Sequence, residues 1–253
     1  MRVTIIGTGA AYPGPGEVCS GFLVQEGTTN LLIDCGNGVL GNLQKYINPA
    51  DITDIYISHL HADHFFDLIP YRYFLFYGLH VTKDKRPHLY LPPDGKGVLE
   101  KTVSYFAETG TFFDDAFYVS EYQAENPVTL ADFSVLPVPV KHYIPSYGIS
   151  ITGKHRVAYS SDSGECEGLQ KLAEEADVFI CNAGDSLDNG QVNNWGHLKP
   201  EKAGVLAEQA GVKRMLLSHL LTGSSKQWCL ESAAAHFKGS LDIAISGASY
   251  ELA

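Results

Sequence analysis

The stretch SHLHADH, residues 58 to 64, concentrates metal-ligand side chains within six positions: His59, His61, Asp63 and His64. In extended backbone, side chains two positions apart point to the same side, so His59 and His61 can share one metal ion. Asp63 and His64 lie just beyond and can reach a second ion a few ångströms away. Imidazole and carboxylate together suit Zn²⁺, with Mn²⁺ or iron as alternatives.

Four ligands do not complete two sites, so others must come from elsewhere in the chain. His142 follows the apolar run SVLPVPVK, Asp162 follows RVAYSS, and His219 follows RMLLS. Each therefore lies just beyond a predicted strand, as His59 does, where sheet proteins gather functional groups on loops. Each residue alone could be an ordinary polar residue at a strand end, but that interpretation weakens when all are considered with the first cluster.

The elements that must position these residues are short strands rich in Val, Ile and Tyr, bounded by Gly, Pro or Asp. The predicted strands are 3–7, 21–24, 30–34, 55–58, 88–91, 133–140, 147–152, 156–160, 178–181, 214–218 and 242–246. The predicted helices are 38–46, 65–77, 98–108, 168–175, 200–210 and 226–237. Strands come in runs with helices between them, which predicts an α/β fold of α+β type, with two packed sheets and helices outside. We interpret residues 1–253 as one domain, with 125–133 as its best internal joint.

These motifs resemble the metallo-β-lactamase superfamily, and within it the ribonuclease Z-like branch. SHLHADH matches the HxHxDH motif of the superfamily, and IIGTGAAYP (5–13) and LLIDCGNG (31–38) resemble the opening motifs of the branch. The motifs of the third histidine, the bridging aspartate and the last histidine are matched by VKHYIPSYGISI (140–151), YSSDS (159–163) and LLSHL (216–220).

The resemblance implies a four-layer αββα metallo-β-lactamase-like sandwich with two divalent metal ions at one edge, zinc being expected and manganese the alternative. The implied ligands are His59, His61 and His142 for one ion, Asp63, His64 and His219 for the other, and Asp162 bridging both. A hydroxide between two such ions can attack phosphorus, which predicts a zinc-dependent hydrolase with Asp63 in its catalytic centre. Asp34 is expected to orient one of the metal-bound histidines.

His197, in NWGHLKPEKAG, follows a glycine in a loop before the predicted helix 200–210. By the resemblance it matches the histidine that protonates the leaving oxygen, a role that suits a group titrating near neutral pH. A structural role at the helix start is the alternative. The chain has HLK where ribonuclease Z has His-Ser-Thr, and CNAGDS where that enzyme has the glutamate that polarises the histidine. Asn182 can hydrogen-bond but cannot stabilise an imidazolium as a carboxylate would, which leaves Asp185 as an alternative partner.

The expected substrate is small. The formal net charge is −11, and an acidic chain repels phosphate backbones. Only nineteen residues separate His142 from Asp162, and two predicted strands fill them, which leaves no room for the arm with which bacterial ribonuclease Z grips tRNA. We therefore expect a phosphodiesterase for a small ester such as a cyclic nucleotide, similar to arm-less relatives, and no binding of structured nucleic acid. The alternative is a ribonuclease Z-like endoribonuclease of tRNA 3′-processing type; an iron-dependent oxidoreductase and a carbonyl-ester or β-lactam hydrolase are less favoured.

Two aromatic stretches, 65–79 and 105–122, have three interpretations: core packing, an apolar wall or lid beside the metals, or the face of a homodimer. No apolar run reaches the ~18 residues of a transmembrane helix, and MRVTIIGTGA lacks the features of a signal peptide. The five cysteines are odd in number and scattered, which argues against a disulfide framework. We therefore expect a cytoplasmic protein with no membrane segment.

Overall fold

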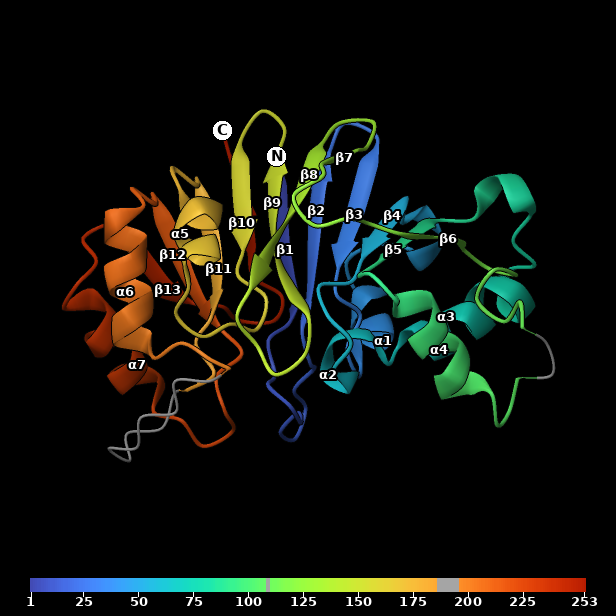
Figure 1. Cartoon of the computed structure of the whole chain (residues 1–253), viewed down its shortest axis with the longest axis horizontal. Coiled ribbons are helices and arrows are strands. Elements are labelled where there is room, and N and C mark those ends of the chain that lie inside the picture. Colours follow the sequence, from blue (N-terminus) through green and yellow to red (C-terminus); the bar gives the residue numbers. More distant parts are fainter. Residues whose placement is uncertain (108–109, 186–195) are drawn as a thin grey trace.

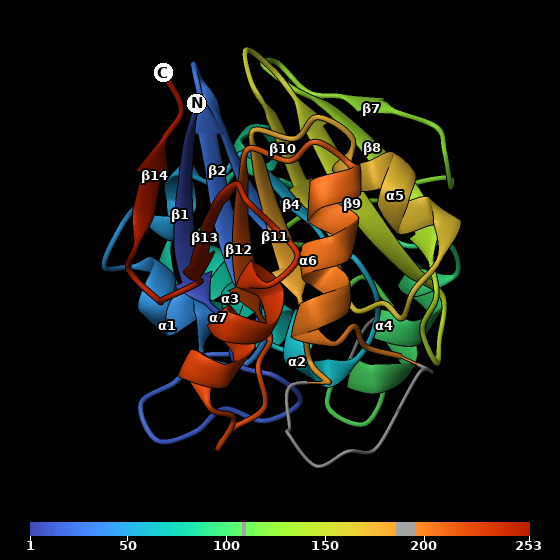
Figure 2. The ribbon, with the colours of Figure 1, turned by 90° about the vertical axis from the view of Figure 1, so that its left-hand side faces the viewer.

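The computed structural model describes residues 1–107, 110–185 and 196–253. Two seven-stranded β-sheets face each other at its centre (Figure 1). Helices cover the outer face of each sheet, so the layers run helix, sheet, sheet, helix (Figures 1 and 2). The αββα fold class predicted from the sequence is confirmed.

The first sheet has the strand order β14-β1-β2-β3-β4-β5-β6. Its strands are β1 (Arg2–Gly7), β2 (Gly21–Glu26), β3 (Thr29–Ile33), β4 (Asp54–Tyr56), β5 (His88–Leu91), β6 (Tyr118–Glu121) and β14 (Ser249–Glu251). The strands from β3 to β6 run parallel, whereas β1 is antiparallel to both of its neighbours. The last strand of the chain therefore returns to the first sheet, where Glu251 lies opposite Arg2.

The second sheet has the order β13-β12-β11-β10-β9-β8-β7. Its strands are β7 (Val128–Thr129), β8 (Ser134–Val140), β9 (Ser146–Thr152), β10 (Arg156–Tyr159), β11 (Val178–Asn182), β12 (Arg214–Ser218) and β13 (Ser240–Ile243). The strands from β10 to β13 are parallel, so their carboxyl ends meet at one edge of the sheet.

Seven α-helices of the described residues surround the sheets: α1 (Val39–Leu43), α2 (Ala62–Phe65), α3 (Leu68–Tyr73), α4 (Gly95–Val103), α5 (Glu167–Ala173), α6 (Pro200–Gln209) and α7 (Lys226–Ala234). The first four belong to the side of the first sheet, and α5, α6 and α7 cover the second (Figure 1). In the described part of the chain, every helix is too short or too polar to cross a bilayer. As the sequence predicts, Pro200 begins α6, and Gly211 follows its end with a φ of 68°.

Three apolar layers hold the sandwich together. The middle layer lies between the sheets and includes Phe22, Tyr159 and Ile180, all fully buried. The outer layers join each sheet to its helices, through residues such as Leu68 for the first sheet and Leu206 for the second. Burial on both faces explains why most strands read as continuous apolar runs.

The helix predicted over residues 65–77 is divided, which corrects the sequence prediction. The structure has α2, then α3, then a π-helical turn at Phe74–Gly78. The break occurs because the backbone of Cys35 takes the hydrogen bonds that a continuous helix would use. Its N–H donates to the carbonyl of His64 at 2.7 Å, and its carbonyl accepts from Asp67 at 3.0 Å. The predicted helix 98–108 also shifts, to Gly95–Val103, and its expected last residue lies outside the described residues.

Candidate metal centre

The residues of SHLHADH occupy the turn between β4 and α2. His61 is the residue before the first turn of α2, and Asp63 and His64 lie inside this short helix. The Cys35 hydrogen bonds fix the helix against the end of β3. Gly36 is required here, because a Cβ at this position would collide with the carbonyl oxygen of Asp63.

Three strand ends of the second sheet bring in the remaining candidates. His142 follows β8, Asp162 follows β10, and His219 directly follows β12. His219 has a φ of 58°, and Ser161, just before Asp162, has a φ of 54°. These left-handed conformations are uncommon for residues other than glycine and concentrate at functional sites.

The structure brings the seven predicted ligands into two adjoining clusters. Within each cluster, one ligand atom from each residue lies within 4.8 Å of all the others. The clusters are His59, His61, His142 and Asp162, and Asp63, His64, Asp162 and His219. Asp162 belongs to both, so its carboxylate lies where two neighbouring ions would be bridged.

The spacing of the ligand atoms fits a metal ion. The Nδ1 atom of His61 lies 3.2 Å from Nε2 of His59 and 3.0 Å from Nε2 of His142. Oδ2 of Asp162 lies 3.2 Å from Nε2 of His219 and 3.4 Å from Nε2 of His64. Ligand atoms in a tetrahedral zinc site are about 3.3 Å apart, because Zn–N bonds are about 2.0–2.1 Å long.

One ring nitrogen at the centre has no hydrogen-bond partner among the described residues. Nε2 of His64 is buried and has no hydrogen-bond partner among these residues, although two carboxylates lie within 3.4 Å. A buried polar atom without a partner is costly, and a bound cation would remove that cost. The donor set therefore fits divalent metal ions.

The electrostatics of the metal-free protein divide the ligands into two groups. Burial lowers the pKa of His59 well below its usual range and that of His142 to about 4, so both rings are neutral and ready to bind a metal. Burial alone would raise the pKa of Asp162, but the imidazoles of His219 and His64 outweigh it and hold that pKa far below normal. The bridging carboxylate is therefore ionised.

In three of the ligand histidines, Nδ1 contacts a residue that belongs to neither cluster. Nδ1 of His64 lies 2.7 Å from Oδ2 of Asp34, as expected from the sequence. Nδ1 of His142 donates to the carbonyl of Gly196 at 2.8 Å, and Nδ1 of His219 lies 3.1 Å from the hydroxyl of Ser20. Such contacts fix the orientation of each ring and leave Nε2 facing the centre. Ser20 and Gly196 were not predicted from the sequence as site residues.

Asp34 is itself fixed by three hydrogen bonds from two neighbours. Its carboxylate accepts hydrogen bonds from the backbone and hydroxyl of Ser58, at 2.8 and 2.9 Å, and from the hydroxyl of Tyr159 at 2.9 Å.

We expect Asp34→Asn to weaken metal binding by about 10–100-fold, because an amide cannot support the His64 ring as a carboxylate does. A competition titration with a chelator measures this, with Asp242→Asn at a surface ion pair with Arg214 as the control. Unchanged affinity in Asp34→Asn would contradict the prediction.

Metal binding should also depend on pH. Burial would lower the pKa of His64, but Asp162 and Asp34 outweigh it and raise that pKa well above 6.5, so the metal-free ring keeps its second proton at neutral pH. A metal ion can bind Nε2 only after this proton leaves. We therefore expect affinity to rise with pH up to the raised pKa of His64 and to level off above it, with a proton released on binding. Titrations in buffers of different ionisation enthalpy measure the release, and pH-independent affinity would contradict it.

His197 lies beside the two clusters. Its ring centroid is 5.2 Å from that of His142 and 5.5 Å from that of His219. Neither expected partner bonds to it in the structure. Asn182 donates instead to Oδ1 of Asp162 at 2.8 Å and to the hydroxyl of Tyr159 at 3.1 Å. Nδ1 of His197 and Oδ2 of Asp185 are both buried without a hydrogen-bond partner among the described residues.

The aromatic stretches 65–79 and 105–122 contribute both to the core and to the surface. Phe65, Tyr71, Phe113 and Phe117 are buried in the apolar layer outside the first sheet. The exposed aromatic residues of the same stretches are Phe66, Tyr73, Tyr77, Tyr105, Phe106 and Tyr118. Core packing is therefore the correct interpretation for the buried residues, and a homodimer face formed by the exposed ones stays a prediction.

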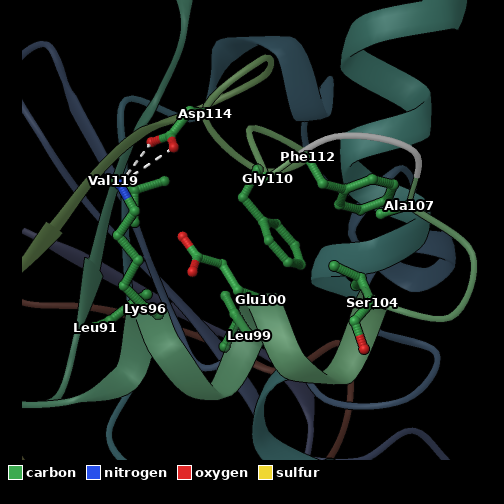
Figure 3. Close-up of a pocket in the computed structure, with 12 residues that line it drawn as sticks. Leu91, Lys96, Leu99, Glu100, Ser104, Ala107, Gly110, Phe112, Asp114 and Val119 are labelled. Atoms are coloured by element: carbon green, nitrogen blue, oxygen red, sulfur yellow. Dashed lines mark hydrogen bonds and ion pairs between the residues drawn. The ribbon is translucent and has the colours of Figure 1, made fainter.

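An apolar cavity of about 200 Å³ lies between α4 and the segment that begins at Gly110 (Figure 3). Leu99 and Phe112 line it, and the ion pair between Lys96 and Asp114, at 3.2 Å, stands at one side. Its described lining includes none of the seven cluster residues. The two ligand clusters therefore lie outside this cavity.

The chain is similar to known proteins in sequence and in fold. Residues 1–186 match the family described as Anti-Pycsar protein Apyc1. A protein of Mycobacterium tuberculosis is 33% identical over 262 residues, which cover 100% of this chain and 92% of that protein. The probable metallo-hydrolase YhfI of Bacillus subtilis is 29% identical over 254 residues, which cover 99% of this chain and 100% of YhfI.

Two solved structures have the same fold as this chain. The crystal structure of the metallo-β-lactamase fold protein YhfI has a TM-score of 0.85 to this chain, with 27% identity and coverage of 98% of both chains. Human tRNase Z, short form, has a TM-score of 0.77, with 25% identity and coverage of 99% of both chains. The chain therefore has the metallo-β-lactamase fold of the ribonuclease Z-like branch and belongs to the Anti-Pycsar protein Apyc1 family.

Proposed function

We propose that the protein is a dinuclear metal-dependent phosphodiesterase that hydrolyses a small ester such as a cyclic nucleotide. The observation that carries the proposal is that two ligand clusters share one carboxylate, Asp162. In this proposal the ligands of the two ions are the members of the two clusters, and Asp63 lies in the catalytic centre. A set of five imidazoles and two carboxylates suits zinc, with manganese as the alternative.

When bound, two such ions would supply an activated water and stabilise the negative charge that develops on the phosphoryl oxygens. The remaining step, protonation of the leaving oxygen, needs a residue of the chain. A bond forms between the water oxygen and phosphorus, the bond from phosphorus to the ester oxygen breaks, and the departing oxygen takes up a proton. We assign that proton to His197, whose ring lies beside His142 and His219.

The surroundings of His197 suit an anionic substrate. Burial lowers the pKa of this ring, opposed in part by the carboxylate of Asp162. The ring is therefore neutral in the free protein, and a bound phosphodiester anion would favour its protonation. A cleft of about 510 Å³ adjoins His197, and its lining includes Lys141, Lys199 and Lys202 together with Glu165 and Glu201. Lys202 pairs with Glu165 at 3.6 Å, and the three lysines exceed the two glutamates, so this lining is less acidic than the chain as a whole.

The interval between His142 and Asp162 supports a small substrate. It contains β9 and β10, which pair with each other as neighbouring strands of the second sheet. This part of the described chain therefore has no arm that could hold a tRNA body. The net charge of −11 gives no general attraction for nucleic acid.

The proposal includes a cytoplasmic setting. The five cysteines, Cys19, Cys35, Cys166, Cys181 and Cys229, form no disulfide in the described structure. Burial raises the pKa of Cys19 to about 11 and that of Cys181 to about 12, so these thiols are unreactive side chains. A reducing compartment suits such a set.

The test compares substrates on the zinc- or manganese-loaded protein. We expect turnover of cyclic AMP and of bis-p-nitrophenyl phosphate, poorer turnover of phosphomonoesters, and little cleavage of precursor tRNA at physiological salt. The metal-free protein is the control. Site-specific trimming of tRNA 3′ ends without activity on cyclic nucleotides would establish the ribonuclease Z alternative, and a preference for β-lactams or thioesters would assign the centre to carbonyl chemistry.

A further inference from the structure

Two glycines lie next to His197, one in the chain and one against its ring. Gly196 precedes it in the chain and is buried, and its carbonyl accepts the hydrogen bond from Nδ1 of His142. The ring of Tyr143 lies against Gly196 so closely that a Cβ there would come within 2.9 Å of Cδ2 and Cζ and would collide with Cε2. The backbone next to His197 is thus held between a ligand of the first cluster and an aromatic ring.

The second glycine, Gly184, lies against the imidazole itself. A Cβ at this position would be 2.7 Å from Nδ1 of His197 and 3.0 Å from its Cγ. The neighbouring backbone is tied to the same loop, because the N–H of Asp185 donates to the carbonyl of Leu198 at 3.2 Å. The His197 ring therefore has Gly184 as one neighbour and the rings of His142 and His219 as others.

Neither glycine is required by its backbone conformation. Among the described residues, the glycines with positive φ are Gly16, Gly27, Gly38, Gly211, Gly223 and Gly247, so neither Gly184 nor Gly196 has the left-handed φ that favours glycine. What these positions require is space. An added methyl group would meet the Tyr143 ring at one position and the His197 ring at the other.

We propose that Gly184 and Gly196 are positioning residues that seat His197 at the metal centre, with Tyr143 as the ring that closes over Gly196. The inference rests on the proposed function, in which His197 protonates the leaving oxygen. A displacement of about 1 Å in a catalytic group can cost about 10²-fold in rate, so one methyl group at either glycine is enough to reveal the role.

The central experiment uses Gly196→Ala in the metal-loaded full chain, with two substrates that differ in leaving group. Cyclic AMP releases an alkoxide, which needs a proton, whereas bis-p-nitrophenyl phosphate releases a phenolate that is already a stable anion. We expect kcat on cyclic AMP to fall by about 10²-fold, with KM and metal content little changed. We expect kcat on the aryl ester to fall by less than about 10-fold, because general-acid catalysis contributes little there.

The matched control is Gly97→Ala. Gly97 is exposed on α4, has no positive φ, and has no atom within 4 Å of its ideal Cβ. The same chemical change should leave both activities unchanged there. Gly184→Ala should also lower kcat on cyclic AMP more than kcat on the aryl ester, because its methyl group would collide with the His197 ring.

Removal of the Tyr143 ring identifies the cause. Tyr143 is 60% exposed, so Tyr143→Ala should cost little stability. If the methyl group of Gly196→Ala acts by colliding with this ring, the double variant Tyr143→Ala/Gly196→Ala should be no less active on cyclic AMP than Tyr143→Ala alone. Multiplied losses in the double variant would overturn the proposed route, as would full activity on cyclic AMP in Gly196→Ala.

A readout that does not use turnover separates this inference from the proposed function. Crystal structures of Gly196→Ala and Gly184→Ala should show the His197 ring displaced from the rings of His142 and His219, and the displacement should disappear in the Tyr143→Ala/Gly196→Ala double variant. An undisplaced ring would overturn the inference. If the parent protein hydrolyses neither phosphodiester, the proposed function fails, and the crystal structures still decide whether the glycines seat His197. Equal losses on both substrates with lost metal would show that the glycines only support folding, which also overturns it.

Discussion

Asp162→Ala should abolish phosphodiester hydrolysis and lower the metal content below two ions per chain. Oδ2 of Asp162 lies between 3.2 and 3.8 Å from Nε2 of His219, His64, His59 and His142, and no other side chain belongs to both clusters. Without this carboxylate, each cluster would have three of its four ligand residues, and no residue would belong to both. A bound metal ion contributes several kcal/mol to stabilising a transition state, so we expect a loss of about 10³-fold or more. Metal analysis and a bis-p-nitrophenyl phosphate assay on the same samples measure both effects.

Two further variants distinguish the bridge from general damage. Asp162→Asn keeps the shape of the side chain, including the contact between Oδ1 and the amide of Asn182, but removes the charge. It should fold normally and still lose activity. Asp177→Asn, at a surface ion pair with Lys213, should keep both ions and full turnover. Two ions per chain and near-normal turnover in Asp162→Ala would show that the clusters do not form a dinuclear centre.

The sequence predicted the buried strands because burial leaves a local signature. The strand predicted at 214–218 coincides with β12, and that predicted at 88–91 coincides with β5. The strands that were missed, β6, β7 and β14, are short and mostly exposed, so they carry no apolar run. Each forms only because a neighbouring strand already presents an unpaired edge, as β1 does for β14.

The ligand clusters were predictable for a related reason. Each ligand follows a strand that the sequence reveals, and parallel strands end at a common edge. The contacts that hold the ligands were not predictable. Ser20 is 199 residues from His219, and Gly196 is 54 residues from His142, and nothing in either local sequence indicates the pairing. The contact of Asp34 with a ligand histidine was predictable, because Asp34 lies in the LLIDCGNG motif, directly before a predicted turn.

The divided helix shows how tertiary contacts override local pattern. Residues 65–77 have a helical arrangement of apolar side chains, but the hydrogen bonds of Cys35 with His64 and Asp67 end the first turn early. That break is what lets α2 present Asp63 and His64 to the centre while α3 packs on the first sheet. The sequence could not show it, because the competing hydrogen bonds come from a turn about thirty residues earlier.

His197→Ala should lower kcat on cyclic AMP by about 10²–10⁴-fold while the protein keeps its full metal content. The ring lies beside His142 and His219 but belongs to neither ligand cluster, so its removal should not release an ion. The loss should depend on the leaving group, because only an alkoxide needs the proton in the transition state. The measurement is kcat for cyclic AMP and for bis-p-nitrophenyl phosphate on metal-loaded protein, together with metal analysis.

His155→Ala is the matched control, because this histidine makes a surface contact of 3.4 Å with Asp177 and lies in neither cluster. It should leave both activities unchanged. His197→Gln should recover little, because an amide can donate a hydrogen bond but cannot transfer a proton at neutral pH. Equal losses on both substrates would instead assign His197 to phosphate binding, and loss of metal would make it a structural part of the centre. A large loss confined to cyclic AMP is the result expected of a proton donor, because its alkoxide leaving group needs a proton and the phenolate of the aryl ester does not.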